Sequence, residues 1–151
     1  MIAVDTNILV YAHRRESRHH EPATRILQEF AEGRVPWAIP WPCLYEFYSV
    51  VTNRRIWKDA ASTADQAWRQ IQAWTSSPSV SLLSETEESL EALEGFLLRP
   101  RVLGPVVHDA RIAALCFVHG AEELLTADRD FSLFPELRTR NPLPPATASN
   151  V

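Results

Sequence analysis

The segment Ile2-Ala3-Val4-Asp5-Thr6-Asn7 decides the fold, because an acidic residue follows a short apolar run directly. Ile2 to Asp5 predicts a buried strand, and Thr6 or Asn7 is predicted to cap a short helix that follows at once. In an open parallel sheet, ligands bind beyond the carboxyl ends of the strands. Asp5 therefore stands where a binding site is expected.

The rest of the chain repeats this alternation of strand-like runs and helical patterns. Further strands are predicted at residues 37–39, 80–83 and 123–126, with a final edge strand at 137–140. Helices are predicted at 22–32, from 42 to about 51, from 63 to about 74, at 86–98 and at 107–119. The alternation indicates an α/β fold with a mostly parallel sheet. Residues 1–140 are predicted to form one domain, and the Pro-rich residues 141–151 an extended or disordered tail.

The composition favours a single globular domain and excludes several classes of protein. The chain has 151 residues, of which 46% are hydrophobic and 23% charged. A net charge of −4 excludes a generic polybasic binder of nucleic acid or membranes, but not a nucleic acid held through metal ions and a few arginines. Two cysteines are too few for a disulfide framework, and we find no signal segment and no long apolar stretch. We therefore expect a cytoplasmic protein without a membrane partner.

The aspartates carry most of the functional information. Two of the six, Asp59 and Asp65, are explained as turn and cap residues. The others lie against apolar segments: Asp5 ends the first strand, Asp109 lies in the first turn of an apolar helix, and Asp128 and Asp130 follow the strand at 123–126. If the first and fourth strands are neighbours, these carboxylates converge at one edge of the sheet.

Clustered carboxylates repel one another unless one of them binds a proton or a cation neutralises them. Mg²⁺ and Mn²⁺ prefer oxygen ligands, and the sequence has no Cys/His spacing for structural zinc. A cation held in this way suits phosphodiester hydrolysis, since it lowers the pKa of bound water and neutralises the departing oxygen. The chain also lacks a Gly-rich phosphate loop.

Four segments in this order resemble the PIN-domain ribonucleases of the VapC toxin type. They are Val4-Asp5-Thr6-Asn7, a helical Glu46, His108-Asp109-Ala110-Arg111-Ile112-Ala113-Ala114, and Leu125-Thr126-Ala127-Asp128-Arg129-Asp130-Phe131. The resemblance covers residues 2 to about 140 and implies a three-layer α/β/α sandwich around a mostly parallel sheet. It also implies Mg²⁺-dependent cleavage of RNA, with Mn²⁺ as a substitute metal.

The resemblance assigns the acids as catalytic residues and metal ligands. Asp5 and Asp109 are the principal ligands, Glu46 is a second acid that acts directly or through water, and Asp128 completes the set. Asp130 is an additional candidate, because residues two apart in an extended segment face the same side. The alternative for Glu46 is an ordinary solvent-facing helix position.

Three polar residues beside these acids are candidates for supporting roles. Asn7 and Thr126 are expected to orient ligands or water. Thr6 is expected mainly to cap the first helix and secondarily to touch the site.

Candidate contacts to the RNA substrate are arginines, because their planar guanidinium groups pair well with phosphates. We name Arg14, Arg15 and Arg18 in the first loop and Arg129 beside the acids; Arg54, Arg55 and Lys58 form a further basic group. Ordinary solvated surface positions are the alternative for each residue.

Five tryptophans lie in the first half of the chain, and most are expected in the core; they are Trp37, Trp41, Trp57, Trp68 and Trp74. With Phe47 and Tyr48 they are also suited to an apolar groove or a dimer surface. The resemblance implies a VapB-like antitoxin partner, whose tail occupies such a groove, and a homodimer.

Four alternative functions compete with this one. A Mg²⁺-binding receiver domain requires an acidic doublet after the first strand and a late lysine, whereas Lys58 is the only lysine here. A haloacid-dehalogenase-like phosphatase requires a second Asp where Asn7 stands. A PIN-fold nuclease that acts on other RNA or on DNA outside a toxin–antitoxin pair remains the main alternative, beside a PIN-fold binding module without activity.

Overall fold

A five-stranded parallel sheet forms the centre of the molecule. The computed structural model describes residues 1–145, and the sheet has the order β3-β2-β1-β4-β5. Its strands are β1 (Ile2–Val4), β2 (Trp37–Pro40), β3 (Val80–Leu83), β4 (Glu123–Leu125) and β5 (Thr139–Arg140). Every strand pair is parallel, and β1 pairs with β4 in the register Val4 opposite Leu125. The first and fourth strands are therefore neighbours, as the predicted site requires.

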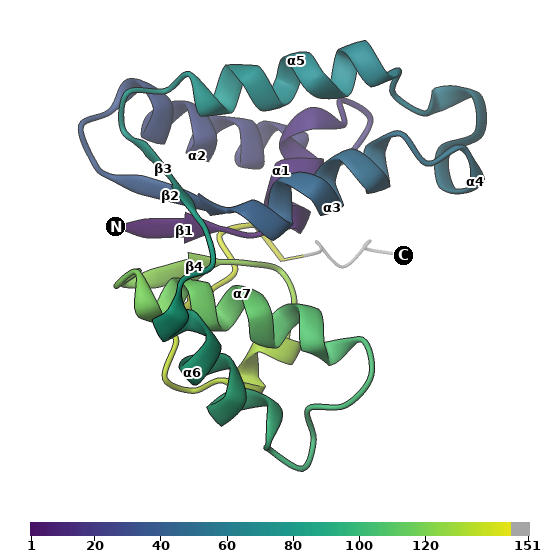
Figure 1. Ribbon diagram of the computed structural model, residues 1–151. Coiled ribbons are helices and arrows are strands. Elements are labelled where there is room, and N and C mark those ends of the chain that lie inside the picture. Colours follow the sequence, from purple (N-terminus) through teal and green to yellow (C-terminus); the bar gives the residue numbers. More distant parts are fainter. Residues whose placement is uncertain (146–151) are drawn as a thin grey trace.

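Helices cover both faces of this sheet and confirm the predicted α/β/α sandwich. Figure 1 shows α1, α2, α3 and α5 on one face and α6 and α7 on the other. Their bounds are α1 (Thr6–His13), α2 (His20–Glu32), α3 (Trp41–Val51), α4 (Arg54–Trp57), α5 (Ala64–Thr75), α6 (Glu87–Leu97) and α7 (Val106–Val118). Two short 3-10 helices, η1 (Lys58–Ala60) and η2 (Asp130–Leu133), follow α4 and β4.

The segment from residue 54 to residue 60 was not predicted as helical. It contains α4 and η1, and Asn53 begins it by accepting a hydrogen bond from the backbone N–H of Arg55. The segment has no buried residue, so it lacks the apolar periodicity on which helix prediction depends.

The predicted tail of residues 141–151 lies partly outside the described residues, which end at 145. Within the described part, Leu143 is buried against the core. Packing therefore extends beyond residue 140.

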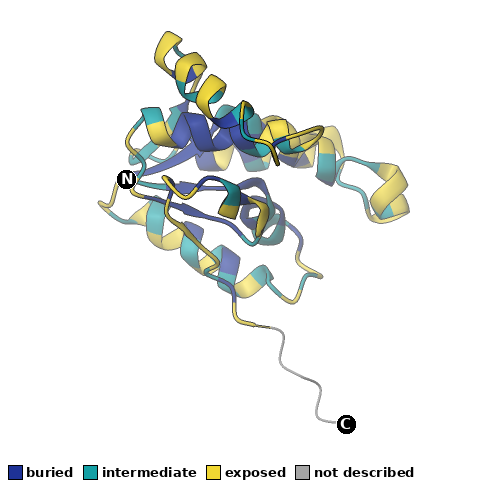
Figure 2. Ribbon diagram, turned by 90° about the horizontal axis from the view of Figure 1, so that it is seen from below, coloured by how far each residue is buried: buried dark blue, intermediate teal, exposed yellow. Residues whose placement is uncertain are grey.

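The core lies along the sheet and the inward sides of the helices, whereas the outer faces of the helices are exposed (Figure 2). Trp37 on β2 and Trp74 on α5 belong to this core. Trp41 and Trp57 are half-buried and pack against the core, so of the five tryptophans only Trp68, on the outer side of α5 and 55% exposed, departs from the expectation that most are core residues. Among residues 1–145, no helix has the length and apolar character needed to cross a membrane.

Candidate metal centre

Asp5 lies at the carboxyl end of β1 and is itself the N-cap of α1. Its Oδ1 accepts a hydrogen bond of 2.7 Å from the backbone N–H of Thr6. The prediction that Thr6 or Asn7 caps this helix is therefore wrong by one residue. The side chain of Asp5 is nearly buried and cannot move without breaking this cap.

A hydrogen-bond network fixes the second oxygen of Asp5. Asp5 Oδ2 accepts from Thr126 Oγ1 at 2.6 Å and from Asn7 Nδ2 at 2.8 Å. Asn7 Oδ1 in turn accepts from the backbone N–H of Ala127, and Thr126 Oγ1 from that of Asp128. These bonds join the ends of β1 and β4, so Asn7 and Thr126 set the relative positions of two segments that carry acids.

Glu46 on α3 is connected to the same network through Thr6. Thr6 Oγ1 donates to Glu46 Oε2 at 2.9 Å. The Glu46 side chain is exposed, although apolar residues surround it in the sequence. Thr6 thus orients an acid. Its expected main role, capping the first helix, is wrong.

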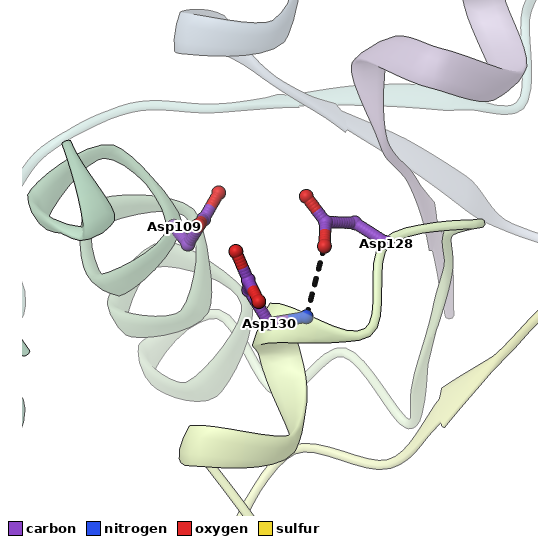
Figure 3. Close-up of side chains that lie close together, drawn as sticks. All are labelled: Asp109, Asp128 and Asp130. Carbon is purple, nitrogen blue, oxygen red and sulfur yellow. Dashed lines mark hydrogen bonds between the residues drawn. The ribbon is translucent and has the colours of Figure 1, made fainter. Parts of the chain in front are cut away.

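The remaining acids converge from α7 and from the segment after β4. One carboxylate oxygen from each of Asp109, Asp128 and Asp130 lies within 4.8 Å of the others, and Figure 3 shows the three side chains around one space. The segment that carries Asp128 and Asp130 is not extended, as the prediction assumed, because Asp130 begins η2 and its backbone N–H donates to Asp128 Oδ1 at 2.8 Å. This turn still brings both carboxylates beside Asp109.

A pocket of about 270 Å³ joins Asp109 and Asp128 to Asp5 and Glu46, whereas Asp130 does not line it. Four of the predicted acids line it, together with residues from α1 and α3; the lining residues are Asp5, Thr6, Asn7, Val10, Tyr11, Glu46, Val50, Asp109 and Asp128. Sequence reasoning missed Tyr11, the one aromatic residue in this lining. It also missed Cys43, whose Sγ lies 3.7 Å from Asp5 Oδ1; its position one helical turn before Glu46 was the available signal.

The electrostatics of the site favour a bound cation. Burial raises the pKa of Asp5, and hydrogen bonds from Thr126 and Thr6 oppose the effect. Burial also raises the pKa of Asp109 to about 7, with further contributions from the neighbouring carboxylates, of which Asp128 is the largest. Without a cation, the site therefore retains a proton near neutral pH.

The donor set fits Mg²⁺ or Mn²⁺. Mg²⁺ binds oxygen atoms at about 2.0–2.1 Å, which places two ligand oxygens no more than roughly 4.2 Å apart. The oxygens of the three clustered aspartates need only small side-chain movements to reach that spacing. Two of these side chains, Asp128 and Asp130, are exposed and free to make them.

The arginines predicted to contact RNA differ in their exposure. Arg15 and Arg18 in the α1–α2 loop and Arg129 beside the acids are exposed. Arg14 is buried, with its guanidinium stacked on the ring of Trp57. Arg14 therefore does not offer its charge to a phosphate at the surface, because its side chain is used inside the protein.

An apolar groove of about 710 Å³ lies apart from the acids, between α3 and α5. Trp41, Leu44, Tyr45, Tyr48 and Trp68 provide most of its large side chains. Of the aromatic residues predicted for such a groove, Trp41, Tyr48 and Trp68 line it. The others do not: Trp37, Phe47, Trp57 and Trp74.

The fold is that of a PIN domain, and residues 2–137 match the family model described as "PIN domain". The chain is 35% identical over 143 residues to "VapC ribonuclease Mb2897" of Mycobacterium bovis, a match that covers 95% of this chain and 96% of the relative. "Ribonuclease VapC43" of Mycobacterium tuberculosis gives the same values.

Solved structures agree with the fold. Mycobacterium tuberculosis VapC20, described as a sarcin-ricin loop cleaving toxin, has a TM-score of 0.65 at 20% identity, over 87% of this chain and 93% of that one. The chain in the structure of VapBC2 from Rickettsia felis bound to a promoter DNA fragment has a TM-score of 0.64 at 21% identity, over 93% and 98%. The chain belongs to the PIN-domain family and, within it, to the VapC ribonucleases, which confirms the resemblance and leaves a receiver domain and a phosphatase without support.

Proposed function

We propose that this chain is a Mg²⁺-dependent endoribonuclease, with Mn²⁺ as a substitute metal, and the toxin of a VapBC-type pair. The observation that carries the proposal is the convergence of acids from four separate segments on one pocket: the end of β1, α3, α7 and the turn after β4. Such a set has no evident structural purpose, since it places like charges together.

The surroundings of each acid indicate its role in the proposed metal site. Asp5 is a rigid ligand, because it accepts hydrogen bonds from Thr6, Asn7 and Thr126. Asp109, Asp128 and Glu46 complete the metal set, and Asp130 supplies a further oxygen beside Asp109. When bound, the metal activates water and neutralises charge on the phosphate.

The test is cleavage of a structured RNA by the purified protein with EDTA, Mg²⁺ or Mn²⁺. We expect cleavage only with metal, and we expect Asp5→Asn and Asp109→Asn to abolish it. Asp65→Asn is the matched control, because Asp65 is an exposed aspartate on α5 that forms an ion pair with Arg69. Cleavage by both site variants contradicts the assignment of the acids, and cleavage of DNA alone shifts the proposal to a DNA-directed PIN nuclease.

We also propose a VapB-like antitoxin as partner, with an apolar segment of that partner in the α3–α5 groove. The groove fits this role because Tyr45 and Trp68 expose 63% and 55% of their surfaces there. Co-purification with the product of the neighbouring reading frame tests the pairing. Tyr45→Ser with Trp68→Ser is expected to abolish binding and to leave RNA cleavage intact.

A homodimer and a cytoplasmic location complete the proposal. The cytoplasm is where RNA is found, and both cysteines of the chain are buried and free. Light scattering of the purified protein tests the homodimer, for which twice the chain mass of 17.1 kDa is expected.

A further inference from the structure

Residues 53–60, here called the basic arm, contain α4 and η1 and project from the end of α3 (Figure 1). Three of their side chains are positive and exposed: Arg54, Arg55 and Lys58. The one acid, Asp59, lies 3.5 Å from Arg54, and both side chains are almost completely solvated, so this pair neutralises little. Among the described residues, Arg55 and Lys58 take part in no ion pair. The arm therefore presents unused positive charge on a protein whose net charge is −4.

Contacts to other parts of the protein hold the basic arm in place in spite of its exposure. The Arg14 guanidinium lies 4.0 Å from the centre of the Trp57 ring, and its Nη1 donates to the carbonyl of Ala60 at 2.7 Å. Trp57 Nε1 donates to the carbonyl of Val50 at 2.8 Å. Lys58 adopts a positive φ of 53°, which a side chain with a Cβ adopts only where its surroundings enforce it. These contacts join the arm to the ends of α1 and α3.

The same two helices connect the basic arm with the metal centre. The site pocket includes Val10 and Tyr11 on α1 and Val50 on α3 beside the acids. Val50 thus lines the pocket and also holds the arm through its carbonyl. Figure 1 shows α4 on the side of the molecule toward which β1 points, which is the side of the acids. The two helices α1 and α3 therefore contact the site pocket and, through Arg14 and Val50, the basic arm.

We propose that the basic arm binds the phosphate backbone of the RNA strand that passes the metal centre, and that Arg14 positions the arm from inside. The inference rests on the proposed ribonuclease function and deepens it. The acids repel phosphates, so a substrate needs cationic contacts outside the metal site. Exposed arginine and lysine side chains provide such contacts, and contacts to phosphates position a strand without reading its bases.

The first experiment compares two variants of the full chain in steady-state RNA cleavage over a range of NaCl concentrations. The arm variant combines Arg54→Gln and Arg55→Gln. The control combines Arg25→Gln and Arg34→Gln, two exposed arginines on α2 and on the loop before β2. Each lost contact to single-stranded RNA lowers affinity roughly fivefold at 0.1 M salt and reduces the salt slope by about 0.7.

We therefore expect the arm variant to raise KM roughly 25-fold, to reduce the salt slope by about 1.4 and to leave kcat unchanged. The control is expected to match the wild type. Equal KM values in the arm variant and the wild type overturn the inference. This holds also if the arm variant binds the antitoxin more weakly, because the arm then contacts the antitoxin and not the RNA. If the wild type itself cleaves no RNA, the proposed function fails first, so the two failures are distinguishable.

The second experiment tests Arg14 as a positioning residue. Arg14→Gln removes both the stacking on Trp57 and the bond to Ala60, and we expect faster proteolysis within residues 53–60 together with a reduced salt slope of KM. A merely structural role lowers the melting temperature without changing that slope, and this result overturns the positioning role. The arm variant keeps the inference testable if Arg14→Gln fails to fold, because its substitutions are at the surface.

Discussion

Replacing Asp109 by Asn should abolish cleavage and, at the same time, stabilise the metal-free protein. The Asp109 carboxyl has a pKa raised to about 7, chiefly by burial and then by the charges of its acidic neighbours. The folded state thus retains a proton that the unfolded chain releases near pH 4. The free energy of unfolding of the wild type therefore falls as pH rises from about 4 to about 7.

The size of this loss follows from the two pKa values. Ionising a carboxyl with a pKa of about 7 in the folded state costs about 4 kcal/mol at neutral pH relative to an exposed aspartate. The Asp109 side chain is only half-buried, and solvent screening reduces this value to about 1–2 kcal/mol. Asn has the same shape and no charge. We therefore expect Asp109→Asn to be more stable than the wild type by that amount above pH 7, and equally stable below pH 4.

Urea denaturation in EDTA at pH values from 4 to 8 measures this difference. Asp59→Asn is the control, because the Asp59 side chain is fully exposed and should give no pH-dependent gain. Saturating Mn²⁺ should stabilise the wild type by about 2–3 kcal/mol at a hundred times its Kd, and the variant far less. A variant that is less stable than the wild type at pH 8, or a gain that is equal at all pH values, refutes the reasoning.

Three further substitutions distinguish residues that act at the metal centre from residues that stabilise the fold around it. Thr126→Val removes the hydroxyl that donates to Asp5, and should cost about 1–3 kcal/mol in urea denaturation and weaken Mn²⁺ binding roughly 10–100-fold by calorimetry, whereas Thr126→Ser should keep both. Glu46→Gln should reduce cleavage at least about tenfold while changing stability by less than about 0.5 kcal/mol, since its side chain is exposed; an unchanged rate returns Glu46 to the solvent-facing alternative. Phe47→Ala should cost about 3–5 kcal/mol in urea denaturation, because Phe47 is fully buried against Trp74, and a smaller loss means that the core closes around the cavity.

Strands and long helices were predictable because their signals are local. Ile2–Val4 is an apolar run, and β4 contains the apolar pair Leu124 and Leu125. Thr63 and Thr86 each stand at a helix start with a capping box. The short helix α4 was not predictable in this way, because it depends on a distant residue: the guanidinium of Arg14 holds Trp57 and Ala60 in place.

The acids of the site were predictable, but the geometry between them was not. A parallel sheet brings the ends of β1 and β4 together, so Asp5 and Asp128 had to be near one another once those strands were neighbours. The hydroxyl of Thr6, by contrast, was free to cap a helix or to bind Glu46, and the choice depends on how α3 packs beside α1. Arg14 illustrates the same limit, since an arginine in a polar loop carries no local signal that it is buried.

The surroundings of the acids explain how one site can be both rigid and adaptable. Asp5 is nearly buried, and its oxygens already accept three hydrogen bonds from nitrogen and hydroxyl donors, so its position is fixed before any cation arrives. Asp128 and Asp130 are exposed on a short turn and can adjust at little cost. In the proposed site, Asp5 and Asp109 would hold the cation from the inner side, and the exposed Asp128 and Asp130 would be able to move toward it. A bound cation would then offset the repulsion between these carboxylates, so we expect metal binding to stabilise this end of the sheet.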